Sequence, residues 1–555
     1  MAYPAFCSTN AGAAACSCFF VYFFALRYNI PWFDDYENIP YFLTRFLHAP
    51  DLAARVEALL RPNNEHRVLY ARLVVLAQYY LTGGLHFSNL MLLGNASLVV
   101  IFWLLYRSLR WHETQPNRAV LGLLPVTLLL FTAQNYILTF TAVFSLQYLA
   151  IIMLVMLTIF ALVHDKPLFF GIAVALGVLS TFSMGNGLIV WPAGAGALLL
   201  QRRWRASAGW LVLGGLSIYL YFRGYPVQQG NAAGFEYVVQ HPFQTLAGVF
   251  IFAGCVFDLF PTLPFEKRIY LPFVAGLVLL VGLGIWFFQK IFRPTRPASR
   301  FEAFVAGSLL FLLANVLLIC FFRLRFNFDL TLHNSYRIYG LTLWAIASVL
   351  LFSQLTESAR ARFWPLVWVF FLGINALTYL TYLPEAVERR KHMQGLAFNQ
   401  QHSRIGLGGT RNSKLAHFID SLTVMMHDRN WYSLPRPAIT PSELQLLTPA
   451  DSTPVNIPLQ LLLKPDYLVV NNTQPGYHVG LNEGAYVVLK ANQRTYLLFA
   501  TRHRPLGVRP WQFSPGFTTA IPTAMVQPGR YRLGVFRTYP DRSLIQYTSQ
   551  YVDIP

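Results

Sequence analysis

The sequence predicts a polytopic α-helical membrane protein with about 11 transmembrane helices and a C-terminal β-sandwich domain outside the membrane. The 555-residue chain is 55% hydrophobic and only 12% charged, about half the charged share of soluble domains. Its apolar runs lack the polar interruptions that a helix with one wet face needs. Near the C-terminus these long runs give way to short stretches in which apolar and polar residues alternate. These observations exclude a soluble enzyme, a disordered chain and a disulfide-linked secreted module.

The net charge of the chain agrees with the same class. There are 43 Lys and Arg residues against 24 Asp and Glu, a net charge of +19, and the basic residues cluster where apolar runs end, as the positive-inside rule requires. No basic stripe with interleaved aromatic residues indicates nucleic acid. No Lys or Arg precedes Arg27, so we interpret the first apolar run as a retained anchor and not as a cleaved signal.

Eleven segments have the length and apolarity of a membrane span. They start near Ala11, Phe87, Ala119, Ser145, Leu168, Leu188, Gly209, Tyr270, Phe304, Ile338 and Pro365. The basic clusters at 107–118, 202–205, 290–300 and 360–362 lie on one side of the membrane only if residues 243–260 do not cross. We therefore predict that 243–260 form a re-entrant or interfacial element and that the N-terminus is cytoplasmic.

This orientation predicts three domains. Residues 1–382 form the transmembrane domain, whose outer loop 29–86 carries interfacial helices. Residues 383–454 form a helical connector. Residues 455–555 form a β-sandwich, because stretches such as "YLVV", "AYVVLK" and "TYLLFA" alternate with turn residues. The connector and the sandwich are predicted to be periplasmic or extracellular, with the chain in a bacterial inner membrane.

Adjacent acids follow directly after the first predicted span, in the string "PWFDDYENIP". A carboxylate at the rim of a membrane has a raised pKa, so Asp34 or Asp35 is a candidate general base, with Glu37 close behind. Adjacent residues on a helix point about 100° apart. One acid can therefore act as base while the other orients a substrate or a cation. The alternative is a solvated loop that keeps the segment out of the bilayer.

A second group of polar residues, Glu65, His66 and Arg67, precedes an apolar run. If helical, this segment is an interfacial helix. The guanidinium of Arg67, with Arg72 nearby, suits a phosphate, and His66 suits proton transfer. Glu65 and His66 lack the spacing of a metalloprotease zinc site. The alternative is an interfacial helix without a catalytic role.

The late loop "FRLRFNFDLTLHNSYRIYG" places three arginines on the predicted outer side, against the positive-inside rule. Arg323, Arg325 and Arg337, with Tyr336 beside them, therefore require an anionic partner there: a headgroup, a phosphate or the acids of the first loop. Structural ion pairing is the alternative. The turns at 135–146 and 181–187 either join helical hairpins or line a cavity.

Taken together, these features resemble the GT-C class of integral-membrane glycosyltransferases. The matching features are the acid pair after the first span, the long first loop, about 11 spans, the arginines of the late loop and the outer C-terminal domain. The strings "NEHR" and "FSMGNGLIVWP" are also similar to ones in bacterial membrane proteins of this kind. A W-W-D-type motif is missing, so transfer to protein asparagine is not expected.

The resemblance implies a polyprenyl-phosphate-linked sugar as donor and a glycan or lipid acceptor on the outer face. It makes Asp34 or Asp35 the base, and Arg337, with Arg323 or Arg325, the group that holds the lipid phosphate. A divalent metal, Mg²⁺ or Mn²⁺, stays open. The residues fit an inverting displacement. A lipid-linked glycan flippase or transporter, and a glycan polymerase or ligase, are the alternatives.

Overall fold

The computed structural model describes residues 3–63, 66–225, 230–435, 454–474, 477, 479–481, 483–492 and 494–555. It is mostly helical, with helix over 65% of the chain. Its contacts divide it into two compact units. We call the first, made of residues 1–22, 45–74 and 90–379, the helical unit. The second, residues 23–44, 75–89 and 380–555, is the sandwich unit.

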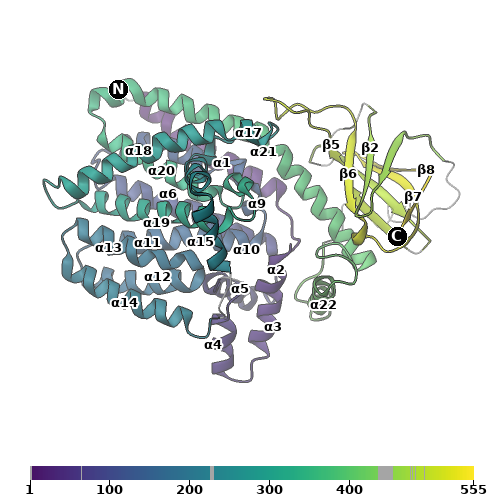
Figure 1. The fold of residues 1–555 in the computed structure, drawn as a ribbon, viewed down its shortest axis with the longest axis horizontal. Helices are drawn as coiled ribbons and strands as arrows, with labels where there is room; N and C mark the ends of the chain where they lie inside the picture. Colours follow the sequence, from purple (N-terminus) through teal and green to yellow (C-terminus); the bar gives the residue numbers. More distant parts are fainter. Residues whose placement is uncertain are drawn as a thin grey trace. The chain divides into compact units, whose positions relative to one another are not determined.

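Every segment that the sequence predicts to span the membrane contains helix. The longer helices are α1 (Tyr3–Leu26), α6 (Phe87–Leu109), α11 (Ala150–Leu162), α12 (Pro167–Ser183), α13 (Val190–Leu200), α14 (Trp204–Phe222), α18 (Tyr270–Phe292), α19 (Arg300–Arg323), α20 (Arg337–Gln354) and α21 (Glu357–Ser403). The segment near Ala119 is the bent pair α7 (Pro116–Gly122) and α8 (Leu124–Leu130). In the helical unit α11 packs against α12 and α13, and α14 packs against both of these (Figure 1).

Shorter helices fill the connections. They are α2 (Asp34–Tyr36), α3 (Phe42–Leu47), α4 (Leu52–Leu60), α5 (Leu69–Thr82), α9 (Tyr136–Thr139), α10 (Ala142–Phe144), α15 (Gly230–Gln240), α16 (Pro242–Ala253), α17 (Phe265–Arg268) and α22 (Lys414–Asp428). Within the described residues, six helices are long and apolar enough to cross a membrane, or seven if a bent pair counts as one span. The prediction of about eleven spans therefore stays a prediction.

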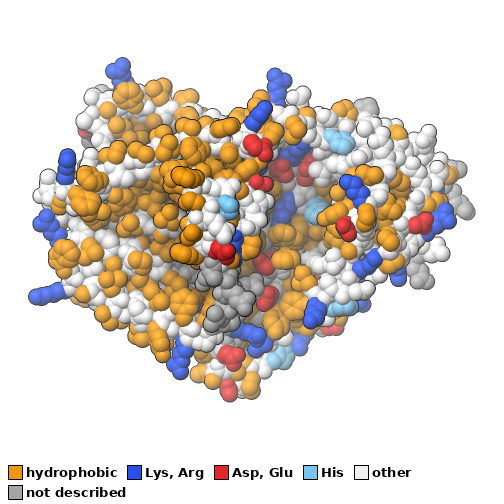
Figure 2. Space-filling view, in the orientation of Figure 1, with side chains coloured by type: hydrophobic (Ala, Val, Ile, Leu, Met, Phe, Trp, Pro, Cys, Tyr) orange, Lys and Arg blue, Asp and Glu red, His pale blue; other side chains and the backbone are white. Residues whose placement is uncertain are grey.

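Several helices of the helical unit are apolar on their exposed side as well as their buried side. On α14 and α18 the exposed residues include Val212 (72% exposed) and Val278 (65%), while Trp210 and Trp286 are buried. Figure 2 shows hydrophobic side chains over much of the visible face of this unit, with Lys and Arg at its margins. A helix that is hydrophobic all round belongs in the core of a large protein or in a membrane.

The segment that was predicted not to cross, residues 243–260, is a short helix packed closely against a long one. The helix α16 has 12 residues, which rise about 18 Å, whereas the hydrocarbon core is about 30 Å thick. Gly254, the residue that follows α16, meets α18 at Gly276, where a Cβ on either glycine would lie under 2 Å from a backbone oxygen of the other segment. Whether 243–260 are re-entrant stays a prediction.

This close contact predicts a difference between two glycines of α18. A Cβ at Gly276 would lie 1.8 Å from the Phe250 oxygen, whereas one at Gly282 would have nothing within 4 Å. Gly276→Ala should therefore destabilise the protein by about 1–3 kcal/mol or more, and Gly282→Ala should stabilise it by about 0.5–1 kcal/mol. Thermal unfolding of both purified variants checks this. Equal unfolding temperatures would show that the two helices do not pack at Gly276.

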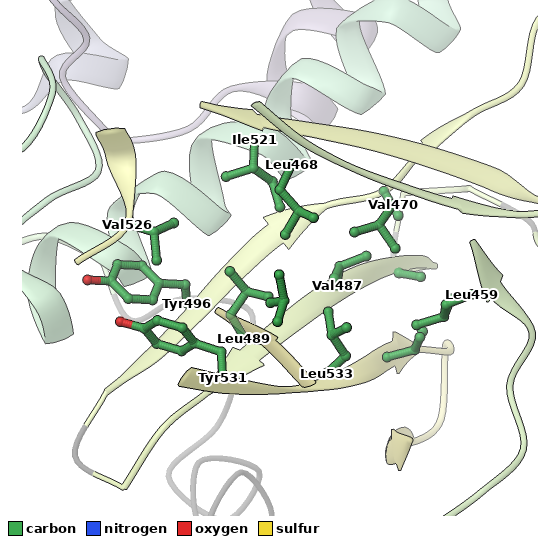
Figure 3. Close-up of a cluster of buried hydrophobic side chains, with 14 of the residues drawn as sticks. Leu459, Leu468, Val470, Val487, Leu489, Tyr496, Ile521, Val526, Tyr531 and Leu533 are labelled. Carbon is green, nitrogen blue, oxygen red and sulfur yellow. The ribbon is translucent and has the colours of Figure 1, made fainter. Parts of the chain in front are cut away.

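The sandwich unit contains the antiparallel C-terminal domain that the sequence predicts. One sheet has the order β1-β2-β6-β5 and the other the order β4-β3-β7-β8. The strands are β1 (Leu459–Leu463), β2 (Tyr467–Asn472), β3 (Gly484–Lys490), β4 (Thr495–Phe499), β5 (Thr501–Arg502), β6 (Phe517–Pro522), β7 (Gly529–Thr538) and β8 (Ser543–Ile554). Leu468 and Ile521 of one sheet and Val487, Leu489 and Leu533 of the other belong to one buried cluster (Figure 3).

The long helix α21 covers the outer face of the second sheet. Phe398 of α21 packs with Tyr486 and Val488 of β3. The side-chain amide of Asn399 forms hydrogen bonds with the backbone of the edge strand β4. Its Nδ2 donates to the Leu497 oxygen at 2.9 Å, and its Oδ1 accepts from the Leu497 N–H at 2.7 Å. Both faces of β3 are therefore buried, which explains the continuous apolar run of this strand.

Candidate functional site

The adjacent acids of the first loop lie at the start of the short helix α2 in the sandwich unit. Phe33, the residue before the helix, has φ 47° and ψ −102°, a positive-φ conformation that costs a bulky side chain about 1–3 kcal/mol. A π-helical turn, Glu37–Tyr41, follows α2 and contains Pro40. Strained backbone on one side and an irregular turn on the other thus fix the direction of the two acids.

The two carboxyl groups have different surroundings. Asp35 is fully buried, and its Oδ2 accepts the Trp32 N–H at 3.0 Å. Asp34 is partly exposed, and burial raises the pKa of its carboxyl above the ordinary value. Glu37 is exposed. The geometry therefore fits two different roles. Asp35 fixes the backbone of the loop through its hydrogen bond with Trp32, and Asp34 has an accessible carboxyl whose raised pKa suits a general base.

Sequence reasoning missed the residues that support this loop. Arg389 of α21 donates from Nε to the Tyr28 hydroxyl at 3.2 Å, and its guanidinium lies 4.4 Å from the centroid of the Trp32 ring. The Thr423 hydroxyl of α22 donates to the Tyr36 hydroxyl at 3.3 Å. Arg389 lies more than 350 residues from Tyr28 in the sequence, so no local pattern could pair them.

In the helical unit the structure brings together two strings that the sequence analysis treated separately. The Gly185 N–H donates to His66 Nδ1 at 3.3 Å. The next residue, Asn186, donates from Nδ2 to Asn315 Oδ1 at 2.5 Å and to the Tyr339 hydroxyl at 2.7 Å. The first loop, the 181–187 turn, α19 and α20 therefore share one polar cluster. Glu65 lies outside the described residues.

Tyr336 of the late loop belongs to the aromatic surroundings of this cluster. Its ring centroid lies 6.0 Å from that of Tyr148 and 6.0 Å from that of His333. Tyr148 also lies 6.5 Å from Tyr339. The late loop thus meets the segment that follows the 135–146 turn.

The arginines after His66 hold the ends of helices. Arg67, which is buried, donates from Nε to the Tyr221 oxygen and from Nη2 to the Arg223 oxygen, both at 3.0 Å. Arg72 donates from Nη1 to the Leu59 oxygen at 2.8 Å. Carbonyl groups at helix C-termini lack partners within the helix, so these guanidinium groups stabilise the ends of α14 and α4. A role for Arg67 toward a phosphate stays a prediction.

Arg337 has an internal anionic partner that the sequence did not reveal. It is 1% exposed, its Nη2 donates to Asp258 Oδ2, and its Nε donates to the Leu332 oxygen at 3.0 Å. Arg268 binds both oxygens of the same carboxylate at 2.5 Å. Structural ion pairing, the alternative weighed for this loop, therefore accounts for the burial of Arg337.

The other two arginines of the late loop are more accessible. Arg323, the last residue of α19, and Arg325 are both partly exposed, and the Arg325 guanidinium lies 4.5 Å from the centroid of the Phe326 ring. The acids of the first loop and these arginines belong to different units. Their predicted meeting therefore stays a prediction.

The donor groups give no support for a metal site. Among the described residues, no three His, Cys, Asp or Glu side chains are grouped in a way that could hold a metal ion. Asp34 and Asp35 supply two carboxylates, and the second is buried against the Trp32 N–H. These two carboxylates alone do not form a site for a divalent cation.

Comparison with known proteins finds no match for this chain among family models, curated proteins or solved structures.

Proposed function

We propose that this protein is an integral-membrane glycosyltransferase that moves a sugar from a polyprenyl-phosphate carrier to a glycan or lipid acceptor. The observation that carries the proposal is the pair of acids after α1. One carboxyl is buried and backbone-bound, and the other is accessible with a raised pKa. A general base is most effective when its pKa approaches the working pH, and a raised aspartate pKa moves in that direction.

The exposed surface of the helical unit supports a membrane setting. Large apolar side chains such as Leu216 (55% exposed), Val278 (65%) and Val369 (69%) face outward on α14, α18 and α21. Exposed apolar side chains spread over several long helices indicate contact with lipid or with another protein. We propose the bacterial inner membrane, with the first loop and the C-terminal domain on the periplasmic or extracellular side.

The proposed reaction is a single inverting displacement. The acceptor hydroxyl oxygen attacks the anomeric carbon of the sugar while Asp34 takes its proton. The bond from that carbon to the phosphate oxygen breaks, and the polyprenyl phosphate leaves with the electron pair. Arg323 and Arg325 are the proposed partners of the negative charge on the leaving phosphate, since the Arg337 guanidinium is buried and already bound to Asp258.

Mass spectrometry of surface glycans and lipid-linked sugars tests the proposed function in cells with and without the gene. Deletion should remove one glycan modification and raise the amount of one polyprenyl-phosphate sugar, because the donor is no longer consumed. Re-expression of the wild type should reverse both changes. If neither pool changes, the proposal is wrong. Accumulation of unpolymerised lipid diphosphate-linked repeat units would instead identify a polymerase or ligase.

A further inference from the structure

A cavity of about 170 Å³ lies in the sandwich unit, between the segment that follows α1 and the helix α21. Arg27, Tyr28 and Asn29 line it from the first segment, and Arg390 and Gln394 line it from α21. Arg390 and Gln394 are four residues apart and therefore share one face of the helix. The cavity has room for several groups the size of a water molecule, each about 30 Å³.

The cavity has two cationic side chains and no acid to balance them. The Arg27 guanidinium lies 4.9 Å from the centroid of the Phe24 ring, and Arg390 Nη1 donates to the Ala25 oxygen at 3.0 Å. Within the described part of the chain, neither arginine forms an ion pair with a carboxylate. The charge of the cavity is therefore positive.

Two buried polar atoms of the lining also lack partners. Arg390 Nε, a donor, and Gln394 Oε1, an acceptor, are both inaccessible to solvent and have no hydrogen-bond partner among the described residues. Buried polar groups are almost always hydrogen-bonded. Neither atom has accessible surface, so a ligand in the cavity reaches them after the two side chains turn toward it, and it then supplies an acceptor for Arg390 and a donor for Gln394.

We propose that this cavity binds an anionic ligand that also carries a hydroxyl group. Its phosphate or carboxylate oxygens accept hydrogen bonds from Arg390 and Arg27, whose planar guanidinium groups match an oxyanion. Its hydroxyl group donates to Gln394 Oε1 once the amide has turned toward the cavity. A sugar phosphate or an acidic sugar has this chemistry, and so does the glycerol headgroup of an anionic lipid. This binding site is additional to the proposed transfer reaction and does not depend on it.

The cavity is connected to the acid loop through three residues. Tyr28, which lines the cavity, accepts a hydrogen bond from Arg389. Arg389 in turn covers the ring of Trp32, whose backbone N–H binds Asp35. A ligand in the cavity would thus rest against the same framework that orients the acids.

Titration of the purified full-length protein with glucose 1-phosphate tests the proposal. The wild type should bind it saturably, and Arg390→Gln and Arg27→Gln should each weaken binding at least about tenfold. Gln394→Leu should abolish the preference for glucose 1-phosphate over inorganic phosphate. Arg362→Gln, an exposed arginine on α21 outside the cavity, should change nothing, and thermal unfolding confirms that each variant is folded.

A second arm distinguishes a lipid headgroup from a soluble ligand. The protein is extracted from nanodiscs that contain phosphatidylglycerol and is then purified. If the cavity binds a lipid headgroup, the purified wild type should retain this lipid and the Arg27→Gln variant should lose it. Retention that is equal in both proteins, together with glucose 1-phosphate binding that is absent or unaffected by the arginine variants, would overturn the proposal. Neither arm measures sugar transfer, so failure here leaves the proposed function untouched.

Discussion

Asp34→Asn is expected to reduce sugar transfer by about 10²–10⁴-fold, the usual contribution of a general base, while binding of the lipid-linked donor is retained. Asparagine has nearly the same shape as aspartate but cannot take the proton of the acceptor hydroxyl. Turnover and donor binding are measured on the same membrane preparations. Asp51→Asn is the matched control: Asp51 caps α4 through the Ala54 N–H at 2.8 Å, and asparagine caps helices equally well.

The raised pKa of Asp34 predicts that Asp34→Asn also changes folding stability. The variant should lose activity but gain stability. Between the ordinary aspartate pKa and the raised one, the folded protein retains a proton that the unfolded chain has released. Folding stability therefore falls as pH rises through that window. Above the window, Asp34→Asn should unfold at a higher temperature than the wild type although it is inactive. Loss of both turnover and stability would instead indicate a structural role for Asp34.

Removal of the Asp258 carboxylate is expected to cause the largest loss of stability, about 3–5 kcal/mol in Asp258→Ala. The side chain of Arg337 is 1% exposed and that of Asp258 is 0% exposed, so the variant leaves a buried guanidinium without its counter-ion. Thermal unfolding of the purified protein measures the loss. The double variant Asp258→Ala, Arg337→Met should recover part of it, because the uncompensated charge is also removed.

An exposed ion pair of the same unit provides the control. Arg118 and Glu357 are paired, but their side chains are 38% and 75% exposed, so Glu357→Gln should cost under about 1 kcal/mol. If Asp258→Ala unfolds at the temperature of Glu357→Gln, Arg337 is not held by Asp258. Arg337 would then be a stronger candidate for the leaving phosphate.

The sequence predicted the apolar helices and the antiparallel C-terminal domain because both depend on local periodicity. Apolar runs predicted the positions of α6, α18 and α19 in the sequence, and short alternating stretches predicted the strands of the sandwich. The covering of β3 by α21 could not be predicted in detail. The only local indication of this covering is the continuous apolar run at 485–489. Such a run does not by itself show whether one face of the strand is buried or both.

The candidate site was predictable only in part. The acids were found because two carboxylates beside an apolar run are unusual, and the pKa of Asp34 shifts in the expected direction. Asp258 was missed because a single acid inside an apolar stretch gives no sign of its partner, which lies 79 residues away. Arg67 and Arg72 have the same donor groups as phosphate-binding arginines, since a guanidinium can donate to carbonyl oxygens as well as to phosphate oxygens. Sequence alone could not separate these roles.

The most direct test is transfer by the purified protein from the lipid-linked sugar that accumulates in the deletion strain. The wild type should convert this lipid to free polyprenyl phosphate in a one-to-one ratio with glycosylated acceptor. The new linkage should have the anomeric configuration opposite to that of the donor. Recovery of the intact lipid-linked sugar after incubation with folded protein and acceptor, with no polyprenyl phosphate released, would contradict the proposal that this protein is a glycosyltransferase.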